Sequence, residues 1–268
     1  MTVITEAQVA QWREAIGRER VEEERLDPLS WQRFAKAVGC KNYPALGHWA
    51  FFLPSPDDED IGPDGHPRRG GFLPDVTLER RMFAASEIEM HHPLKAGVDA
   101  AQTSRVADVT RKQGASGDLV FAKVEKFIEQ AGRLCIAETQ AYVYRDAGAP
   151  VTLPICEDSH PDEATWTPQE VNLFRFSAAT GNAHRIHYDL PYTRDVEGYP
   201  ALIVHGPFTA AKLADLASRD GELASFTFRA SAPLFCGQPV RLERSGDDRY
   251  DAIRCDGVTA VTARATFR

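Results

Sequence analysis

The sequence contains no long apolar run and no excess of basic residues. No apolar stretch approaches the roughly 20 residues that a membrane-spanning helix needs, and the chain does not open on a basic segment followed by an apolar run. We therefore expect neither a membrane span nor a secretory signal. The 31 Lys and Arg residues are outnumbered by 39 Asp and Glu residues, which gives a net charge of −8. This balance, without a basic cluster, argues against nucleic acid as a partner.

Cysteine is sparse and shows no recognisable spacing. The five cysteines are Cys40, Cys135, Cys156, Cys236 and Cys255. An odd number of dispersed cysteines without a Cys-x-x-Cys pair is typical of free thiols in a reducing compartment, not of a disulfide scaffold or a zinc ribbon. We therefore expect a cytoplasmic protein.

Two common catalytic signatures are also absent. The chain has no Gly-rich phosphate loop, which argues against an enzyme that uses NAD or ATP. It has no Gly-x-Ser-x-Gly elbow, which weakens the case for a serine thioesterase. What is present is an ordinary apolar content of 43% over 268 residues, enough for two modest domains or one large one.

The apolar pattern predicts helices mixed with strands. In the charged segment 5–24, Val9, Trp12 and Ile16 have helical spacing, and Asp27-Pro28 interrupts the pattern. Further helices are expected at 30–38, ended by Gly39, at 168–177, capped by Thr167, and at 208–217. The apolar run 46–53 could be a buried helix, but it is too short for its periodicity to decide between helix and strand. Residues 54–72 read as a long loop. Strands are expected at 87–90, 120–127, 134–144, 225–230, 240–243 and 258–267.

The two halves of the chain resemble each other. Residues 93–97 (PLKAG) match residues 233–237 (PLFCG), and each copy follows an alternating strand and precedes further strands. Tandem copies of one helix-plus-sheet unit explain this match. Segment 146–162 is rich in Pro, Gly and acidic residues and is interpreted as a linker. We therefore expect an α+β protein with one domain at 1–150 and a second at 163–268.

The chemistry-bearing residues gather in the second half. Segment 176–189 reads FSAATGNAHRIHYD, and segment 202–207 reads LIVHGP. The first combines an amide, two imidazoles, a guanidinium and a phenol. The second ends an apolar run at the expected start of a helix, where free N–H groups favour negative charge. Proton-moving groups beside such a helix start suit chemistry on a carbonyl compound.

Both segments resemble the active-site motif of the MaoC-like hydratases, a family that includes the hydroxyacyl-thioester dehydratases type 2. The family motif reads Gly-Asp-x-Asn-Pro-x-His, followed by His-Gly before a central helix. This chain has the same spacing from Gly181 to His187 but carries Asn182, His184 and Arg185 where the family has Asp, Asn and Pro. Its variant string, with EGYP at 197–200, resembles the branch containing mesaconyl-C4-CoA and itaconyl-CoA hydratases. In the first half, RRGGFLP at 68–74, EMHHPLKAG at 89–97 and YVYR at 142–145 resemble that branch's N-terminal repeat.

The resemblance implies a double hotdog fold, in which each of two domains wraps an antiparallel sheet around a central helix. It also implies a catalytic set of His187, Asn182 and Gly206. His187 is the expected proton-transfer residue, because imidazole titrates near neutrality. Asn182 cannot titrate, so it is expected to hold a water molecule through its amide. Gly206 is expected to give a backbone N–H to the thioester oxygen, or else to be needed only for the turn.

Other residues are expected to line the substrate pocket: His184, Arg185, Tyr188, Val204, His205 and, from the first domain, His91. Arg185 is a candidate for a second carboxylate on the substrate, for a CoA phosphate, or for a pair with Asp189. Asp189 and Glu197 are candidates to replace the missing acid, although we favour the interpretation that both are solvated surface carboxylates. His184 and His187 are three residues apart, but no Glu or Cys follows at ligand spacing, so no metal is expected.

The implied activity is a hydro-lyase reaction that adds water to, or removes it from, an enoyl-CoA or 3-hydroxyacyl-CoA thioester. The acyl group is expected to be short, branched or dicarboxylic, as in mesaconyl- or itaconyl-CoA, and no cofactor is expected beyond the CoA of the substrate. The first domain is expected to be catalytically degenerate and to shape the acyl pocket. A hotdog thioesterase and a non-catalytic acyl-CoA-binding subunit remain alternatives. A homodimer of double-hotdog chains is compatible with the sequence.

Overall fold

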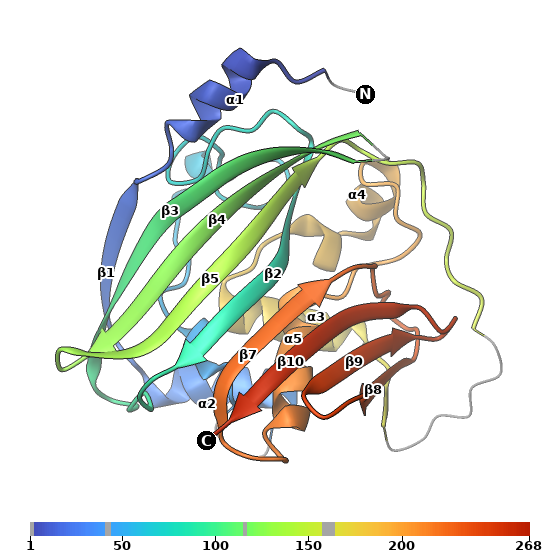
Figure 1. Cartoon of the computed structure of the whole chain (residues 1–268). Helices are drawn as coiled ribbons and strands as arrows, with labels where there is room; N and C mark the ends of the chain where they lie inside the picture. The colour runs from blue at the N-terminus through green and yellow to red at the C-terminus, as the bar shows by residue number, and fades with distance from the viewer. Residues whose placement is uncertain (1–2, 41–43, 115–116, 157–163) are drawn as a thin grey trace.

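The computed structural model describes residues 3–40, 44–114, 117–156 and 164–268. Within these ranges one antiparallel sheet contains ten strands in the order β1-β3-β4-β5-β2-β7-β10-β9-β8-β6 (Figure 1). The strands are β1 (Glu19–Arg25), β2 (Arg80–Met90), β3 (Asp99–Gly114), β4 (Gly117–Gln130), β5 (Arg133–Arg145), β6 (Thr165–Trp166), β7 (Leu223–Ala230), β8 (Val240–Arg244), β9 (Arg249–Arg254) and β10 (Thr259–Phe267).

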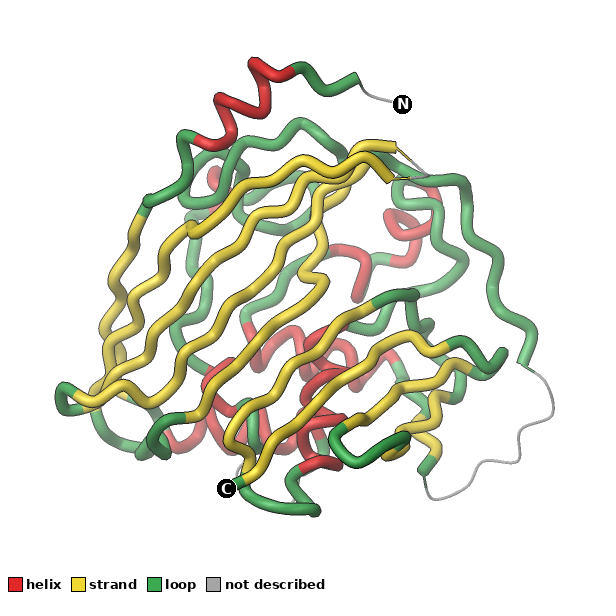
Figure 2. The backbone as a smooth tube through the Cα atoms, viewed as in Figure 1, coloured by secondary structure: helices red, strands yellow, loops and turns green. Residues whose placement is uncertain are grey.

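Helices α2, α3 and α5 lie on one side of this sheet (Figures 1 and 2). The helices are α1 (Glu6–Arg13), α2 (Pro28–Val38), α3 (Glu170–Thr180), α4 (Leu190–Asp195) and α5 (Gly206–Ala217), with 3₁₀ turns η1 (Gly47–Ala50), η2 (Asp58–Asp60) and η3 (Arg185–His187). In the described ranges, no helix is both long and apolar enough to cross a membrane. The main core fills the space between these helices and the sheet.

The sheet consists of two halves that meet at its centre. Strands β1–β5 come from the first half of the chain and β6–β10 from the second. The halves join where β2 pairs with β7, from Ala85 opposite Arg229 to Glu89 opposite Ser225. Because this central pair is antiparallel, the start of β2 lies beside the end of β7. Residues from both halves therefore meet at each end of the β2–β7 pair.

Helix α5 is the central helix of the second half. Seven of its twelve residues are buried, among them Phe208, Ala210, Leu213 and Ala214. A helix that is apolar on most sides must be buried by neighbouring elements on most sides. Strands β7–β10 bury one side of α5. The predicted helix at 208–217 is confirmed, with a start two residues earlier at Gly206.

Helix α2 confirms the helix predicted at 30–38, but it starts two residues earlier, at Pro28. Asp27 caps it by accepting hydrogen bonds from the N–H groups of Leu29 and Ser30, and Pro28 occupies the first turn, where its missing N–H costs nothing. Gly39, at φ 88°, ends the helix in the left-handed conformation that glycine adopts most easily.

Several sequence-based expectations are wrong or incomplete. The segment 5–24 is not one helix: α1 ends at Arg13, Gly17 turns the chain at φ 86°, and β1 then pairs with β3. The cap of α3 is Gln169 rather than Thr167. The run 46–53 contains only the single turn η1. Strand β3 was not predicted, because buried positions such as Gln102 and Ser104 are polar and conceal its alternation.

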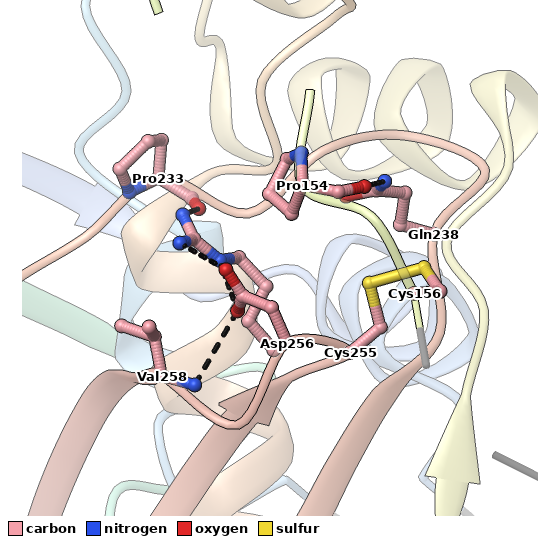
Figure 3. The surroundings of a disulfide bond; sticks show 8 residues. Pro154, Cys156, Pro233, Gln238, Cys255, Asp256 and Val258 are labelled. Carbon is pink, nitrogen blue, oxygen red and sulfur yellow. Dashed lines mark hydrogen bonds and ion pairs between the residues drawn. A yellow bond between two sulfur atoms is a disulfide. The ribbon is translucent and has the colours of Figure 1, made fainter. Parts of the chain in front are cut away.

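The cysteine prediction also fails. Cys156 and Cys255 form a disulfide across a sequence separation of 99 residues, while Cys40, Cys135 and Cys236 are free. Figure 3 shows the segment carrying Pro154 and Cys156 beside the turn that carries Cys255 and Asp256. Gln238 also holds this segment by donating to Pro154 O at 2.8 Å. Count and spacing cannot reveal such a pair, because the fold alone brings these two positions together.

Candidate active site

A cavity of about 270 Å³ lies where the motif segments of the second half meet the start of β2. We call it the site cavity. The motif residues on its wall are Asn182, His184, Ile186, His187, Val204, His205, Gly206 and Pro207; the first half contributes His66, Arg80, Arg81, Met82, Phe83, Ala84 and Arg145. The remaining lining residues come from 197–203, Thr209, 230–234 and Val261. Six of the nine predicted site residues therefore line one cavity: Asn182, His184, His187, Val204, His205 and Gly206.

The loop after α3 is shaped by one glycine and one amide. Gly181 ends α3 at φ 59°, and Asn182 Oδ1 then accepts a hydrogen bond from the N–H of His184 at 3.0 Å. This bond identifies the amide oxygen, so the NH₂ group of Asn182 is the end that remains for a ligand. The loop therefore uses the amide oxygen of Asn182, and the NH₂ group is the hydrogen-bond donor that the side chain can still offer.

His187 is buried with a defined tautomer. Its Nδ1–H donates to the carbonyl of Ile203 at 2.7 Å, which leaves Nε2 as the unprotonated nitrogen. Burial, followed by the neighbouring His184, lowers the pKa of His187 from 6.5 to about 3. The resting side chain is therefore a neutral imidazole at neutral pH, able to accept a proton but not to donate one from Nε2.

His205 fixes the position of His187 from the other side. The two rings stack with centroids 3.5 Å apart, and Ser177 Oγ lies 2.9 Å from His205 Nε2. His205 Nδ1 is buried without a partner in the described part of the chain. Burial also keeps the pKa of His205 well below its ordinary value, so it too is neutral.

Gly206 begins α5 at the cavity wall. Its φ is not in the left-handed region, and an added Cβ would meet Ala230 Cβ and Phe83 O at 3.6 Å, which is ordinary contact distance. Neither backbone conformation nor packing therefore requires glycine here. Pro207 has no N–H, so Gly206 provides the first N–H of this helix start, where the helix dipole favours negative charge.

The loop 61–67 from the first half is docked on the motif loop, which sequence reasoning missed. The His66 ring lies 4.3 Å from the His184 ring, and the N–H of Arg185 donates to Asp64 O at 2.9 Å. Gly65, at φ 88°, allows the approach, because a Cβ there would lie 1.9 Å from Ala183 O. Burial keeps the pKa of His66 well below its ordinary value, and burial together with His66 lowers that of His184 to about 3.

Glu197 is not the solvated surface carboxylate that the sequence suggested. It is 8% exposed and its Oε2 lies 2.9 Å from Arg80 Nε. Burial raises its pKa despite this ion pair. The sequence did contain one signal for such a buried cluster: two consecutive arginines, Arg80 and Arg81, open a strand in which neighbouring side chains point to opposite faces.

Three predicted pocket residues do not line the site cavity. Arg185 binds Asp189 at 2.7 Å and donates to Pro63 O, so it stabilises the loop contact instead. Tyr188 is 52% exposed. His91 lies at the far end of β2 beside Glu89, with its side chain 39% exposed.

A second cavity, of about 830 Å³, lies at the opposite end of the β2–β7 pair. It is lined by the end of β2 with residues 92–96 and by the start of β7. The site cavity is lined instead by the start of β2 and the end of β7. Its lining includes Gly47 and His48 but no counterpart of the Asn182–His187 motif. In the described residues, no group of three or more His, Cys, Asp or Glu side chains is arranged to hold a metal ion.

Comparison with known proteins identifies the family of this chain. The profile of the family described as hydroxyacyl-thioester dehydratase type 2 matches residues 44–236. Mesaconyl-C(4)-CoA hydratase of Chloroflexus aurantiacus is 46% identical over 229 residues, which is 82% of each chain. The mitochondrial hydroxyacyl-thioester dehydratase type 2 of Schizosaccharomyces pombe is 24% identical over 73% of this chain and 75% of its own.

Solved structures agree on the fold. HtdX of Mycobacterium tuberculosis superimposes with a TM-score of 0.70 at 18% identity, covering 92% of this chain and 99% of its own. A second protein of that organism, described as a double hotdog, gives 0.56 at 11% identity and covers 93% and 95%. The predicted α+β double hotdog is therefore confirmed, and the chain belongs to the hydroxyacyl-thioester dehydratase type 2 family of hydro-lyases.

Proposed function

We propose that this chain catalyses the reversible hydration of a short α,β-unsaturated acyl-CoA. Water adds at Cβ, and the double bond is replaced by a Cβ–O and a Cα–H bond. The observation that carries the proposal is the pairing of a neutral, tautomer-fixed His187 with the helix start at Gly206 on one cavity wall. Enoyl-thioester hydration needs these two elements: a proton acceptor, and a donor for the thioester oxygen.

Gly206 binds the thioester carbonyl in this mechanism. Its N–H donates to the carbonyl oxygen, on which negative charge develops as water attacks Cβ. The helix dipole of α5 stabilises that charge. The absence of a structural need for glycine supports this role, because a residue without Cβ lets the thioester approach the backbone.

His187 moves the proton. Its Nε2 accepts a proton from the attacking water, and the electron pair of the double bond moves to form an enolate on the thioester. The enolate charge raises the proton affinity of the buried imidazole during the reaction. The resulting Nε2–H is then available to protonate Cα, so that no proton is gained or lost over the cycle.

Asn182 replaces an acidic residue of the related motif. Because its oxygen is bound to the N–H of His184, its NH₂ group donates to the oxygen of the attacking water. A donor in this position orients the water lone pair and needs no titration. One imidazole can therefore make both proton transfers while the amide fixes the water.

The name of a relative and the size of the cavity support a substrate in which CoA carries a short acyl group. The relative at 46% identity is named for mesaconyl-C(4)-CoA, and a cavity of about 270 Å³ is smaller than the roughly 300–1,000 Å³ typical of drug-sized ligands. Mesaconyl-C4-CoA is therefore the first substrate to test, with itaconyl-CoA and crotonyl-CoA as comparisons.

The test follows the enoyl-thioester absorbance with each of these three substrates, for the wild type and His187→Ala. The proposal expects the absorbance to fall with at least one substrate without release of free thiol, and to remain constant for the variant. Thiol release would identify a thioesterase, and tight binding without turnover would identify a binding subunit. Either result would overturn the proposal. Light scattering in the same experiment tests the expected homodimer.

A further inference from the structure

The two halves of the sheet are related by an approximate two-fold axis at the central β2–β7 pair. On either side of that pair the strands follow in mirrored order, β5-β4-β3-β1 on one side and β10-β9-β8-β6 on the other (Figure 1). The repeated sequences at 93–97 and 233–237 lie 140 positions apart, and so do Glu87 and Thr227, which face each other in the pair. As in an isologous dimer, equivalent residues therefore lie at opposite ends of the pair. The two cavities occupy equivalent positions, with Leu234 in the lining of the site cavity and Leu94 in that of the second cavity.

The wall of the second cavity follows the same order of elements as the wall of the site cavity. In the second half, α3 ends at the left-handed Gly181, and the turn η3 follows with His187. In the first half, α2 ends at the left-handed Gly39, and the turn η1 follows with His48. The motif sequence is not repeated, but His48 lines the second cavity as His187 lines the site cavity. Each cavity thus has a buried histidine from a 3₁₀ turn in its wall.

His48 is anchored through one ring nitrogen. It is 4% exposed, and its Nε2 lies 3.2 Å from Oε2 of Glu138. Burial works to raise the pKa of Glu138, but the hydrogen bond and charge of His48 and the charge of Lys126 lower it to about 2. The ionised carboxylate can only accept, so Nε2 of His48 carries the hydrogen of this bond. The ring makes no other hydrogen bond among the described residues, which leaves Nδ1 for a ligand in the cavity.

The remaining lining suits an acyl chain on an anionic carrier. Apolar side chains form much of the wall, from Trp31, Met90, Leu94, Ile136 and Leu223. Arg268 pairs with Glu222 at 3.3 Å, whereas no ion pair joins Lys95 to any described residue. The volume of about 830 Å³ lies within the roughly 300–1,000 Å³ of small-molecule sites. The phosphates of CoA supply the kind of anion that Lys95 can bind.

One element of the site cavity has no counterpart in the first half. Gly206 stands at the start of α5, whereas residues 51–79, all of them described, contain no α-helix and only the three-residue turn η2. The second cavity therefore lacks the helix start that binds the thioester oxygen in the proposed mechanism. Its composition favours binding of a thioester over conversion.

We propose that the second cavity binds a second CoA thioester, one whose acyl group carries a hydroxyl on Cβ, and holds it without turnover. A hydroxyl both donates and accepts, so it can pair with Nδ1 of His48 whether or not that nitrogen carries a hydrogen. An enoyl thioester offers no such group at Cβ. The inference rests on the proposed function for its ligand class, because a Cβ hydroxyl is what hydration produces.

Two thioesters that cannot react serve as probes. Hydroxypivaloyl-CoA carries a hydroxyl on Cβ but has no hydrogen on Cα, so it cannot lose water, and pivaloyl-CoA is the same molecule without the hydroxyl. Equilibrium dialysis counts the thioesters bound per chain for wild type, for Ala96→Trp, which fills the second cavity, and for His48→Phe, which removes both ring nitrogens. Arg264→Gln serves as the matched control, because Arg264 pairs with Asp248 on the surface.

Wild type and Arg264→Gln are expected to bind one more molecule of hydroxypivaloyl-CoA per chain than Ala96→Trp. At the site that Ala96→Trp removes, pivaloyl-CoA should bind about 3- to 10-fold more weakly than hydroxypivaloyl-CoA, which is the effect of one hydrogen bond, and His48→Phe should erase that difference. Equal numbers bound by wild type and Ala96→Trp would overturn the inference. Equal affinities of the two thioesters in the wild type, or free CoA that binds as tightly as either, would also overturn it. Circular dichroism shows whether each variant is folded, and if His48→Phe is not, the comparison of wild type with Ala96→Trp still decides.

Failure of the proposed function would be recognised separately, because this test measures binding and not turnover. If the wild type hydrates no enoyl thioester but binds one hydroxypivaloyl-CoA more than Ala96→Trp, only the proposed function fails. If the wild type hydrates its substrate and the two proteins bind equal numbers, only this inference fails.

Discussion

Replacing Gly206 with alanine is expected to change stability and activity in opposite directions. The backbone at this position is not left-handed, and the new Cβ would lie 3.6 Å from both Ala230 Cβ and Phe83 O. Gly→Ala at a compatible position stabilises a protein by about 0.4–1 kcal/mol, chiefly by restricting the unfolded chain. For a chain of this size, that gain raises Tm by about 1–4 °C.

The same methyl group enters the space where the thioester must approach. Displacing the carbonyl by about 1 Å from its donor costs on the order of 100-fold, so kcat/KM for mesaconyl-C4-CoA should fall by about that factor. Calorimetry measures Tm and the enoyl-thioester absorbance measures turnover on the same preparation. Unchanged turnover would refute the role of Gly206 as carbonyl donor. A lowered Tm would refute the claim that the fold does not need glycine here.

Four further changes test other parts of the structure. His187→Ala should reduce hydration by about 10²- to 10⁴-fold with little change in Tm, whereas a loss below tenfold would exclude it as the proton-transfer residue. His184 and His187 have folded pKa values of about 3, below the ordinary 6.5, so their stabilising contribution is complete above pH 6.5 and declines as the pH falls towards 3. Urea unfolding should therefore show that the free energy of unfolding is lower at pH 5 than at pH 7.5, by about 2 kcal/mol per histidine. Equal stabilities at the two pH values would argue against burial of the two side chains in the neutral form. Reducing the Cys156–Cys255 disulfide, or the change Cys156→Ser, should lower the free energy of unfolding by about 2–4 kcal/mol, and identical denaturation curves would contradict a bond that closes so long a loop. Gly65→Ala, whose Cβ would collide with Ala183 O, should cost about 1–3 kcal/mol and reduce turnover, and a variant as active and stable as the wild type would show that this loop contact is dispensable.

Local sequence signals predicted those elements whose boundaries depend on local chemistry. Gly39 was expected to end α2 and does so, whereas Asp27 and Pro28, which were read only as an interruption, cap and open it. Strand β3 escaped prediction because its buried face carries Gln102 and Ser104, so its partner strands and not its own apolar pattern decide its structure. A short-range helical pattern likewise overextended α1, because spacing cannot show that β1 has a strand to pair with.

The candidate site was predictable where it is contiguous in sequence. The segments containing Asn182–His187 and His205–Gly206 do meet in one cavity. His66 and Arg81 were missed because they reach that cavity from more than 100 residues away. The burial of Glu197 could not be read from its own position, because a single carboxylate between Val196 and Gly198 looks the same in sequence whether it is solvated or paired with Arg80.

The central claim is that water adds to Cβ while the thioester remains intact. The most direct measurement incubates the enzyme with mesaconyl-C4-CoA in H₂¹⁸O and analyses the products by mass spectrometry, with His187→Ala as control. The account predicts an intact CoA thioester that is heavier by one ¹⁸O-labelled water and that is absent from the control. Label in a released carboxylate together with free CoA, or label incorporation that does not depend on His187, would contradict it.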